Sequence, residues 1–375
     1  MHRPRPLTRR PAQAPRPDRV YAVLPADVDD PTLPSGGNTY DRRLCAALTA
    51  AGTPVTVLTA AGAWPRPAAS DRDRLARLLA GVPDGASVLL DGLVGCAVPE
   101  VVTSHAGRLH LVLLVHLPLA DETGLSPAAA AALGARERRA VHAAAEVVAT
   151  SRWAARRVER LHGLPTGRVH VAAPGVDPAP VSRGSDGRSH LLCVASVTPH
   201  KGHDVLVEAL ARVADLRCRC VGALRRTPLL AARVRAAVRA HGLAGRVEVV
   251  GPVSDAELQA AYAAADLVVL PSRAETYGMV VTEALARGIP VVATRVGGVP
   301  EALGHTPDGT RPGALVRPGD PAALAAALRR WRDDPRWRAR LRRAALARRT
   351  TLATWPDTAG ALAAVLAPRP VAGSR

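Results

Sequence analysis

The sequence contains no phenylalanine, and aromatic residues make up only 2% of its 375 residues. Hydrophobic residues nevertheless reach 48% of the chain, so alanine, valine and leucine must fill its cores. The length is large for one domain and suits two domains of ordinary size. No uninterrupted apolar stretch approaches the roughly 20 residues that a membrane-spanning helix needs. We therefore expect a globular protein of two domains.

Lysine is almost absent as well. The chain has 50 lysine and arginine residues together, and Lys201 is the single lysine among them. Lysine is a compact point charge on a flexible stem, whereas arginine presents a broad planar group. A site that accepts only the compact charge would explain the exception, and chance survival in an arginine-rich chain is the alternative. We interpret Lys201 as a functional residue.

The cysteines are few, odd in number and without a Cys-x-x-Cys pair. This pattern gives no support for a disulfide framework. We expect small, buried, unpaired side chains in a reducing cytoplasm. The residues concerned are Cys45, Cys96, Cys193, Cys218 and Cys220.

The net charge of +18 is concentrated at the two ends of the chain. Residues 1–19 carry +5 and residues 321–375 carry +9, which leaves +4 for the stretch between them. Residues 1–19 have no apolar core, so we expect a disordered basic arm and not a signal peptide. Basic ends favour an anionic membrane surface, and a solvated arginine face is the alternative. No motif predicts specific binding of nucleic acid.

Apolar strands and helical patterns alternate along both halves of the chain. The first half has expected strands at 20–24, 55–58, 88–90, 109–115, 147–150 and 169–172. The second half has them at 191–197, 217–221, 246–250, 267–270 and 289–293. This alternation predicts an α/β protein with two doubly wound parallel sheets and a cleft between them. We expect domains at 20–178 and 190–350, a linker at 179–189, and a helix in 351–375 that crosses back to the first domain before a short tail.

The segment 271–285 is the most informative part of the sequence. It reads PSRAETYGMVVTEAL and follows the short apolar run at 267–270. A helix that begins near Gly278 would direct unpaired N–H groups and partial positive charge above the strand, which suits a phosphate. Glu275 and Glu283 flank this turn, and their carboxylates suit sugar hydroxyls. The chemistry indicated is that of a sugar attached to a phosphate.

The order of several motifs resembles the family-4 retaining glycosyltransferases, which have the GT-B architecture. The resemblance covers about residues 20–366 and rests on seven segments in the family's order. They are Ser35-Gly36-Gly37, His116-Leu117-Pro118, the segment 174–177, His200-Lys201-Gly202, the segment 251–255, Thr276 to Val280, and the pair Glu275 and Glu283.

The resemblance implies a role for each matching residue. Lys201 would pair with the donor diphosphate, Glu275 would hold hydroxyls of the donor sugar, and His116 would contact that sugar near its reacting face. Glu283 would accept the ribose hydroxyls. The catalytic residues would thus be His116, Lys201 and Glu275, and the other donor-binding residues Gly36, Gly37, Ser196, His200, Val253, Thr276, Tyr277, Gly278, Met279, Val280 and Glu283.

One position departs from the family pattern. The family usually has an arginine five residues before the lysine, and this chain has Ser196 there. A hydroxyl can donate to a phosphate but carries no charge. His200 and Arg273 are the candidates to supply part of the missing charge.

The implied reaction needs no metal and no cofactor. Negative charge that grows on the departing diphosphate would be stabilised by Lys201 and by the helix start at Gly278. The sequence Asp71-Arg72-Asp73 superficially resembles a metal-binding pattern of other glycosyltransferases. We interpret it as the first turn of a helix capped by Ser70.

We expect a cytoplasmic hexosyltransferase that uses a nucleotide sugar such as a UDP- or GDP-hexose and an unidentified acceptor. It could lie at the inner face of the membrane. A phosphorylase or a nucleotide-sugar epimerase on the same fold is one alternative. A non-enzymatic, basic protein that binds membrane or nucleic acid is the other.

Overall fold

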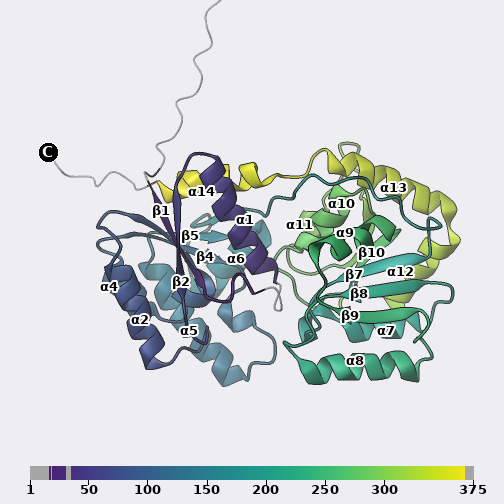
Figure 1. The fold of residues 1–375 in the computed structure, drawn as a ribbon, viewed down its shortest axis with the longest axis horizontal. Coiled ribbons are helices and arrows are strands. Elements are labelled where there is room, and N and C mark those ends of the chain that lie inside the picture. Colours follow the sequence, from purple (N-terminus) through teal and green to yellow (C-terminus); the bar gives the residue numbers. More distant parts are fainter. Residues whose placement is uncertain (1–16, 18, 31–34, 368–375) are drawn as a thin grey trace, which may run out of the picture.

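The computed structural model describes residues 17, 19–30 and 35–367. Two domains lie side by side, each built on a six-stranded parallel sheet with helices on its faces (Figure 1). The prediction of two doubly wound α/β domains is confirmed. Most of the predicted basic arm at 1–19 and the tail at 368–375 lie outside the described residues.

The first domain orders its strands β2-β1-β3-β4-β5-β6. The strands are β1 (Val20–Pro25), β2 (Val55–Ala60), β3 (Ser87–Asp91), β4 (His110–Val115), β5 (Glu146–Ala149) and β6 (Val169–Val171). The helices are α1 (Gly36–Ala50), α2 (Ala69–Ala80), α3 (Gly92–Gly95), α4 (Pro99–His105), α5 (Pro127–Ala143) and α6 (Arg152–His162), with a 3-10 turn η1 at Leu119–Asp121. Strands β3 and β5 are buried along their whole length, as expected for a parallel sheet covered on both faces.

The second domain orders its strands β12-β11-β10-β7-β8-β9. The strands are β7 (His190–Val194), β8 (Arg217–Val221), β9 (Val247–Gly251), β10 (Leu267–Leu270), β11 (Val291–Thr294) and β12 (Gly313–Val316). The helices are α7 (His203–Leu210), α8 (Pro228–Ala240), α9 (Asp255–Ala264), α10 (Met279–Ala286), α11 (Val299–Leu303), α12 (Pro321–Asp333) and α13 (Pro335–Arg349), with a 3-10 turn η2 at Pro199–Lys201.

The structure differs from the sequence prediction at several boundaries. Helix α1 begins at Gly36, with the Ser35 hydroxyl accepting from the Asn38 N–H, so the two glycines lie in the first helical turn and not in a preceding loop. Ser70 is not a cap: α2 begins at Ala69, two residues earlier than predicted, and the Asp71 carboxylate accepts from the N–H of Ala68. Strand β7 ends at Val194, three residues early, and β12 was not predicted.

The segment at 179–189 packs on the second domain instead of hanging free. The Ser182 hydroxyl lies within hydrogen-bond distance of the carbonyls of Tyr262 and Ala263 in the last turn of α9. The Asp266 carboxylate accepts from the N–H and the hydroxyl of Ser185 at 2.9 and 2.5 Å. These hydrogen bonds fix the start of β7 relative to the start of β10. The linker therefore belongs structurally to the second domain.

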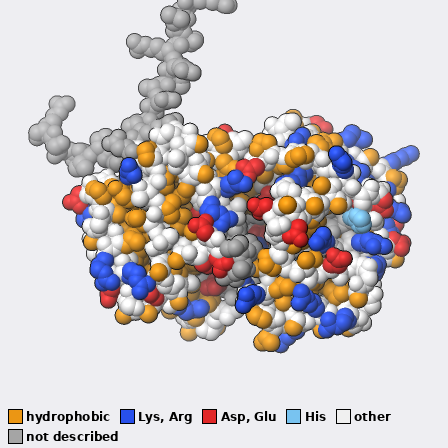
Figure 2. Space-filling view, viewed as in Figure 1, with side chains coloured by type: hydrophobic (Ala, Val, Ile, Leu, Met, Phe, Trp, Pro, Cys, Tyr) orange, Lys and Arg blue, Asp and Glu red, His pale blue; other side chains and the backbone are white. Residues whose placement is uncertain are grey.

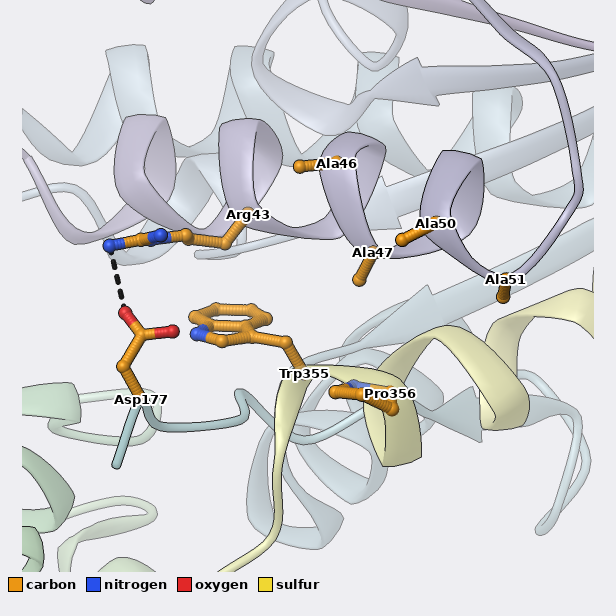
Figure 3. A pocket seen from close by; sticks show the side chains of 8 residues that line it. All are labelled: Arg43, Ala46, Ala47, Ala50, Ala51, Asp177, Trp355 and Pro356. Carbon is orange, nitrogen blue, oxygen red and sulfur yellow. Dashed lines mark ion pairs between the residues drawn. The ribbon is translucent and has the colours of Figure 1, made fainter.

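The last helix, α14 (Trp355–Leu366), returns to the first domain and lies along α1 (Figure 1). Trp355 and Leu362 join the buried cluster around Tyr40 and Leu44. Between the two helices lies a mostly apolar pocket of about 370 Å³ (Figure 3). An ion pair between Arg43 and Asp177, 2.8 Å long, borders it.

All five cysteines are unpaired and buried, as the sequence indicated. None of the helices among the described residues combines the length and the apolar character that crossing a membrane requires. On the face shown in Figure 2, Lys and Arg side chains are spread over both domains and mixed with acidic ones.

Candidate active site

Lys201 and Glu275 form an ion pair where β7 and β10 end in the sheet of the second domain. The lysine Nζ donates to Glu275 Oε1 at 2.6 Å, and the Ser272 hydroxyl donates to the same oxygen at 2.9 Å. The Glu275 side chain is only 10% exposed and that of Lys201 23%. Two residues that are 74 positions apart in sequence thus meet in a partly desolvated site, where charge acts more strongly than in water.

Gly202 explains how the lysine reaches the glutamate. Its backbone is left-handed, with φ of 68°, and a Cβ at this position would collide with the carbonyl oxygen of Pro271. Only glycine allows both the conformation and the close approach. The turn after β7 therefore lies directly against the loop after β10.

The loop from Glu275 to Gly278 is held from both domains. The Ser151 hydroxyl at the start of α6 donates to the carbonyl of Thr276 at 2.6 Å. The N–H of Gly298 donates to the carbonyl of Glu275 at 3.2 Å, and a Cβ at Gly297 would collide with that same carbonyl oxygen. This fixes the direction in which the following helix starts.

Helix α10 begins at Met279 with Gly278 as its N-cap, and no side chain caps it. Its first N–H groups therefore remain available to an anion, as the sequence predicted. The Tyr277 side chain is buried, and burial raises the pKa of its hydroxyl to about 12. Its side chain packs in the core of the second domain, and its predicted contact with the donor stays a prediction.

Glu283 lies one turn into α10. Its Oε2 accepts a hydrogen bond of 2.7 Å from the Tyr262 hydroxyl, and burial raises the pKa of the carboxyl. The Arg287 guanidinium lies 4.3 Å from the centre of the Tyr262 ring. Tyr262 thus orients the carboxylate, and the sequence reasoning missed this residue.

His116 lies at the end of β4 in the first domain, between two buried carboxylates. Its Nε2 is 2.8 Å from Asp41 Oδ1 on α1 and 3.6 Å from Asp91 Oδ2 at the end of β3. Burial alone would lower the pKa of His116, but Asp41 and Asp91 raise it to about 9. The imidazole is therefore a cation at neutral pH and a hydrogen-bond donor.

Asp91 is the more unusual of the two carboxyls. Burial, followed by the nearby charge of Asp41, raises its pKa to about 7. The ligand atoms of Asp41, Asp91 and His116 lie within 4.8 Å of one another, so the group has the composition of a possible divalent-cation site. In this structure, the Nε2 atom of His116 is directed at Asp41, 2.8 Å away.

The two predicted glycines lie between His116 and the start of α10. A Cβ at Gly37 would be 3.6 Å from the His116 ring, and a Cβ at Gly36 would be 3.9 Å from the Met279 sulfur. The first turn of α1 therefore faces α10 across the boundary between the domains. Both sets of predicted site residues come together there.

Ser196 stands where the family usually has an arginine, and neither His200 nor Arg273 replaces the positive charge of that arginine. Burial and the adjacent Lys201 lower the pKa of His200 to about 4, so this ring is neutral at pH 7. Arg273 is engaged elsewhere, because both its terminal nitrogens donate to Asp204 at 2.8 and 2.6 Å. Lys201 therefore supplies positive charge at this turn without a contribution from His200 or Arg273.

Val253 follows β9 and is half-buried beside the apolar cluster of α9 and α10. The next residue, Ser254, caps α9 and is fixed by Glu257, which accepts from its N–H and hydroxyl at 2.9 and 2.7 Å. The segment is therefore rigid, and its predicted contact with a nucleobase stays a prediction.

Sequence reasoning missed Asp41, Asp91 and the Gly297-Gly298 pair. A signal existed for two of the three: Asp91 ends an apolar run and precedes a glycine, and the glycine pair follows a predicted strand. Asp41 lies inside a helix next to Tyr40 and carries no such mark.

Comparison with known proteins gives two family matches that follow one another along the chain. Residues 34–180 match the family described as Glycosyltransferase Family 4, and residues 188–334 match Glycosyl transferases group 1. Together they cover the glycine turn, the lysine turn and the two glutamates.

Curated relatives include D-inositol 3-phosphate glycosyltransferases. The one from Streptosporangium roseum is 35% identical over 290 residues, which are 72% of this chain and 64% of that protein. One from Catenulispora acidiphila is 34% identical over 286 residues, 68% of this chain and 65% of that protein. The matched region is thus slightly less than two thirds of these relatives' length.

Solved structures of low sequence identity share the fold. Sucrose-phosphate synthase from Thermosynechococcus elongatus has a TM-score of 0.71 at 22% identity, covering 91% of this chain and 96% of that one. Anabaena HepE in complex with UDP and glucose has a TM-score of 0.72 at 20% identity, covering 93% and 99%. The GT-B architecture predicted from the sequence is confirmed.

Proposed function

Because the chain belongs to the family-4, group 1 glycosyltransferases, we propose that it transfers a hexosyl group from a nucleotide-diphosphate sugar to an acceptor, with retention and without a metal. The observation that carries this proposal is the Lys201–Glu275 ion pair beside the uncapped start of α10. One site there offers a cation and free N–H groups for phosphate, and a carboxylate for sugar hydroxyls.

The leaving group explains the choice of residues. As the bond between sugar and phosphate breaks, negative charge grows on the departing oxygen of the nucleoside diphosphate. Lys201 Nζ and the N–H groups of Met279 and Val280 stabilise that charge in the transition state. Glu275 holds the hydroxyls of the sugar, so the ion pair seen in the ligand-free protein opens when the donor binds.

His116 acts from the opposite domain. Held protonated between Asp41 and Asp91, it donates a hydrogen bond to the donor sugar beside the reacting carbon. A cation there cannot serve as the base that deprotonates the acceptor. This supports a mechanism in which the departing phosphate takes the acceptor proton on the same face, which gives retention.

UDP- and GDP-hexoses are the donors to be tested first, since HepE has been crystallised with UDP-glucose. The candidate acceptors are glycans, lipids and small molecules. The curated relatives are named for D-inositol 3-phosphate, so a phosphorylated polyol belongs among the acceptors tested.

The test is acceptor-dependent release of nucleoside diphosphate. A thermal-shift screen against UDP- and GDP-hexoses selects the donor, since a ligand at 100 times its dissociation constant stabilises the folded protein by about 2.7 kcal/mol. The selected donor is then incubated with each acceptor class, and product is identified by mass and by the anomeric coupling constant.

Each alternative gives a different outcome. Formation of a sugar 1-phosphate in the presence of inorganic phosphate would identify a phosphorylase, and conversion of the donor without acceptor would identify an epimerase. If no nucleotide sugar shifts the melting temperature and polyanions bind equally well to Lys201→Ala, the transferase proposal is wrong.

A further inference from the structure

A cluster of sulfur and nitrogen atoms lies inside the second domain, apart from the active site. Cys193 is on β7, Cys220 is directly opposite it in register on β8, and His203 begins α7. Their ligand atoms all lie within 4.8 Å of one another. Exposed fractions are 0, 3 and 1%, so water does not reach the group.

Neither ring nitrogen of His203 makes a hydrogen bond of ordinary geometry among the described residues, although the Cys193 thiol lies close enough to interact with the ring. A buried polar atom without a well-formed hydrogen bond lowers the stability of the folded state. Native structures rarely carry this cost without a reason, of which an ion is one. Two thiols facing an imidazole are the ligands that a soft metal ion prefers.

We propose that Cys193, His203 and Cys220 bind a zinc ion that stabilises the second domain. The thiolates of Cys193 and Cys220 offset the two positive charges of Zn²⁺, and a third thiolate leaves a net charge of −1 on the site. The ion binds one imidazole nitrogen directly, and one thiol proton is released to solvent for each zinc–sulfur bond that forms.

Cys218 supplies the fourth ligand of a tetrahedral site. It precedes Cys220 by two residues on β8, it is buried, and its Sγ lies 3.9 Å from that of Cys220. At a zinc–sulfur distance of about 2.3 Å, two thiolates on a tetrahedral ion are about 3.8 Å apart. Cys218 lies outside the group whose ligand atoms are all within 4.8 Å of one another, so its side chain would have to move toward the ion as zinc binds.

The position of His203 gives the ion a structural consequence. His203 follows Lys201 and Gly202 directly, so the zinc would join the phosphate-facing turn to two neighbouring strands. This inference does not depend on the proposed reaction, because a bound ion can be measured without any turnover.

The experiment is native mass spectrometry of the full chain purified from cells grown with added zinc. We expect one zinc per chain, with a mass increase of one zinc ion less the protons released by the coordinating thiols. Replacement by Co²⁺ should give the thiolate charge-transfer and visible bands of tetrahedral cobalt. Wild-type protein without stoichiometric zinc after incubation and gel filtration would overturn the proposal.

Variants locate the ion. Cys193→Ser and His203→Asn should lose the zinc and the cobalt spectrum. Cys96→Ser is the matched control, since Cys96 is equally buried but lies in the first domain. If Cys193→Ser retains full cobalt absorbance, the site is misplaced and the proposal fails. If the two cluster variants do not fold, the wild-type zinc content and cobalt spectrum still decide.

Discussion

Replacement of Lys201 by arginine keeps the charge and changes only its shape, so it isolates what the single lysine of the chain contributes. In the structure, Lys201 Nζ reaches Glu275 at 2.6 Å from a turn that cannot move away, because Gly202 already touches the carbonyl of Pro271. The broader guanidinium must therefore place its charge differently at the phosphate position.

The expected effect is large on rate and small on stability. Displacement of a positioned group by about 1 Å can reduce the rate about 100-fold. That factor corresponds to about 2.7 kcal/mol of transition-state stabilisation. Arginine keeps the positive charge beside Glu275, so the melting temperature without ligand should stay unchanged.

The assay measures kcat and KM from acceptor-dependent diphosphate release, together with thermal unfolding of the ligand-free protein. Arg343→Lys on α13, an exposed position far from the site, is the control for the reverse exchange. Wild-type kcat/KM in the Lys201→Arg enzyme would refute the assignment of Lys201 to the diphosphate. A lowered melting temperature would instead point to a structural defect.

Four further outcomes are expected. Glu275→Gln should reduce sugar transfer more than it reduces nucleotide binding, whereas Glu283→Gln should weaken the binding of the nucleotide itself. If calorimetry with UDP or GDP shows the reverse, the roles given to these two residues are interchanged. Turnover should persist in EDTA. A loss of turnover that Mn²⁺ restores would contradict the metal-independent mechanism, whereas a loss that only Zn²⁺ restores would indicate removal of zinc from the cysteine cluster. The folded-state pKa of His116 lies above its unfolded value, so its contribution to stability is complete below about pH 6.5 and is lost as the pH rises through about 9. The melting temperature of the wild-type protein should therefore fall as the pH rises, and Asp41→Asn should abolish this fall. An unchanged pH profile would show that the Asp41 carboxylate does not hold the proton on His116. Anionic vesicles should bind the chain weakly through residues 1–19 and the arginines of α13, with binding that falls as salt rises, and equal partitioning onto neutral vesicles would exclude this.

Fewer arginines of α13 can take part in the expected vesicle binding than the sequence suggested. Within α13, Arg342 donates to Asp266 and Arg349 donates to the carbonyl of Ala286, so part of the arginine run supports the fold. Arg336, Arg340 and Arg343 are exposed and can meet a surface. Composition alone could not separate the two groups.

Lys201 and Glu275, two of the predicted site residues, lie in contact for a reason that the sequence pattern contains. Lys201 and Glu275 each follow a buried parallel strand, and the ends of parallel strands lie at one edge of the sheet. Periodicity located the strands, and the edge rule then brought the residues together. The same reasoning could not decide whether Arg273 faces the phosphate, since that depends on Asp204, whose carboxylate takes both of its terminal nitrogens.

The sequence by itself determined the alternation of strands and helices, the two domains and the turns that carry the lysine and the glutamates, because these depend on local hydrophobic period and on glycine. Only the tertiary structure decided the charge of His116, which two carboxylates from α1 and β3 set through burial and distance. It also decided that Cys193, His203 and Cys220 form one cluster. Side chains from separate elements meet through sheet order and helix packing, and no pattern within a single segment encodes those distances.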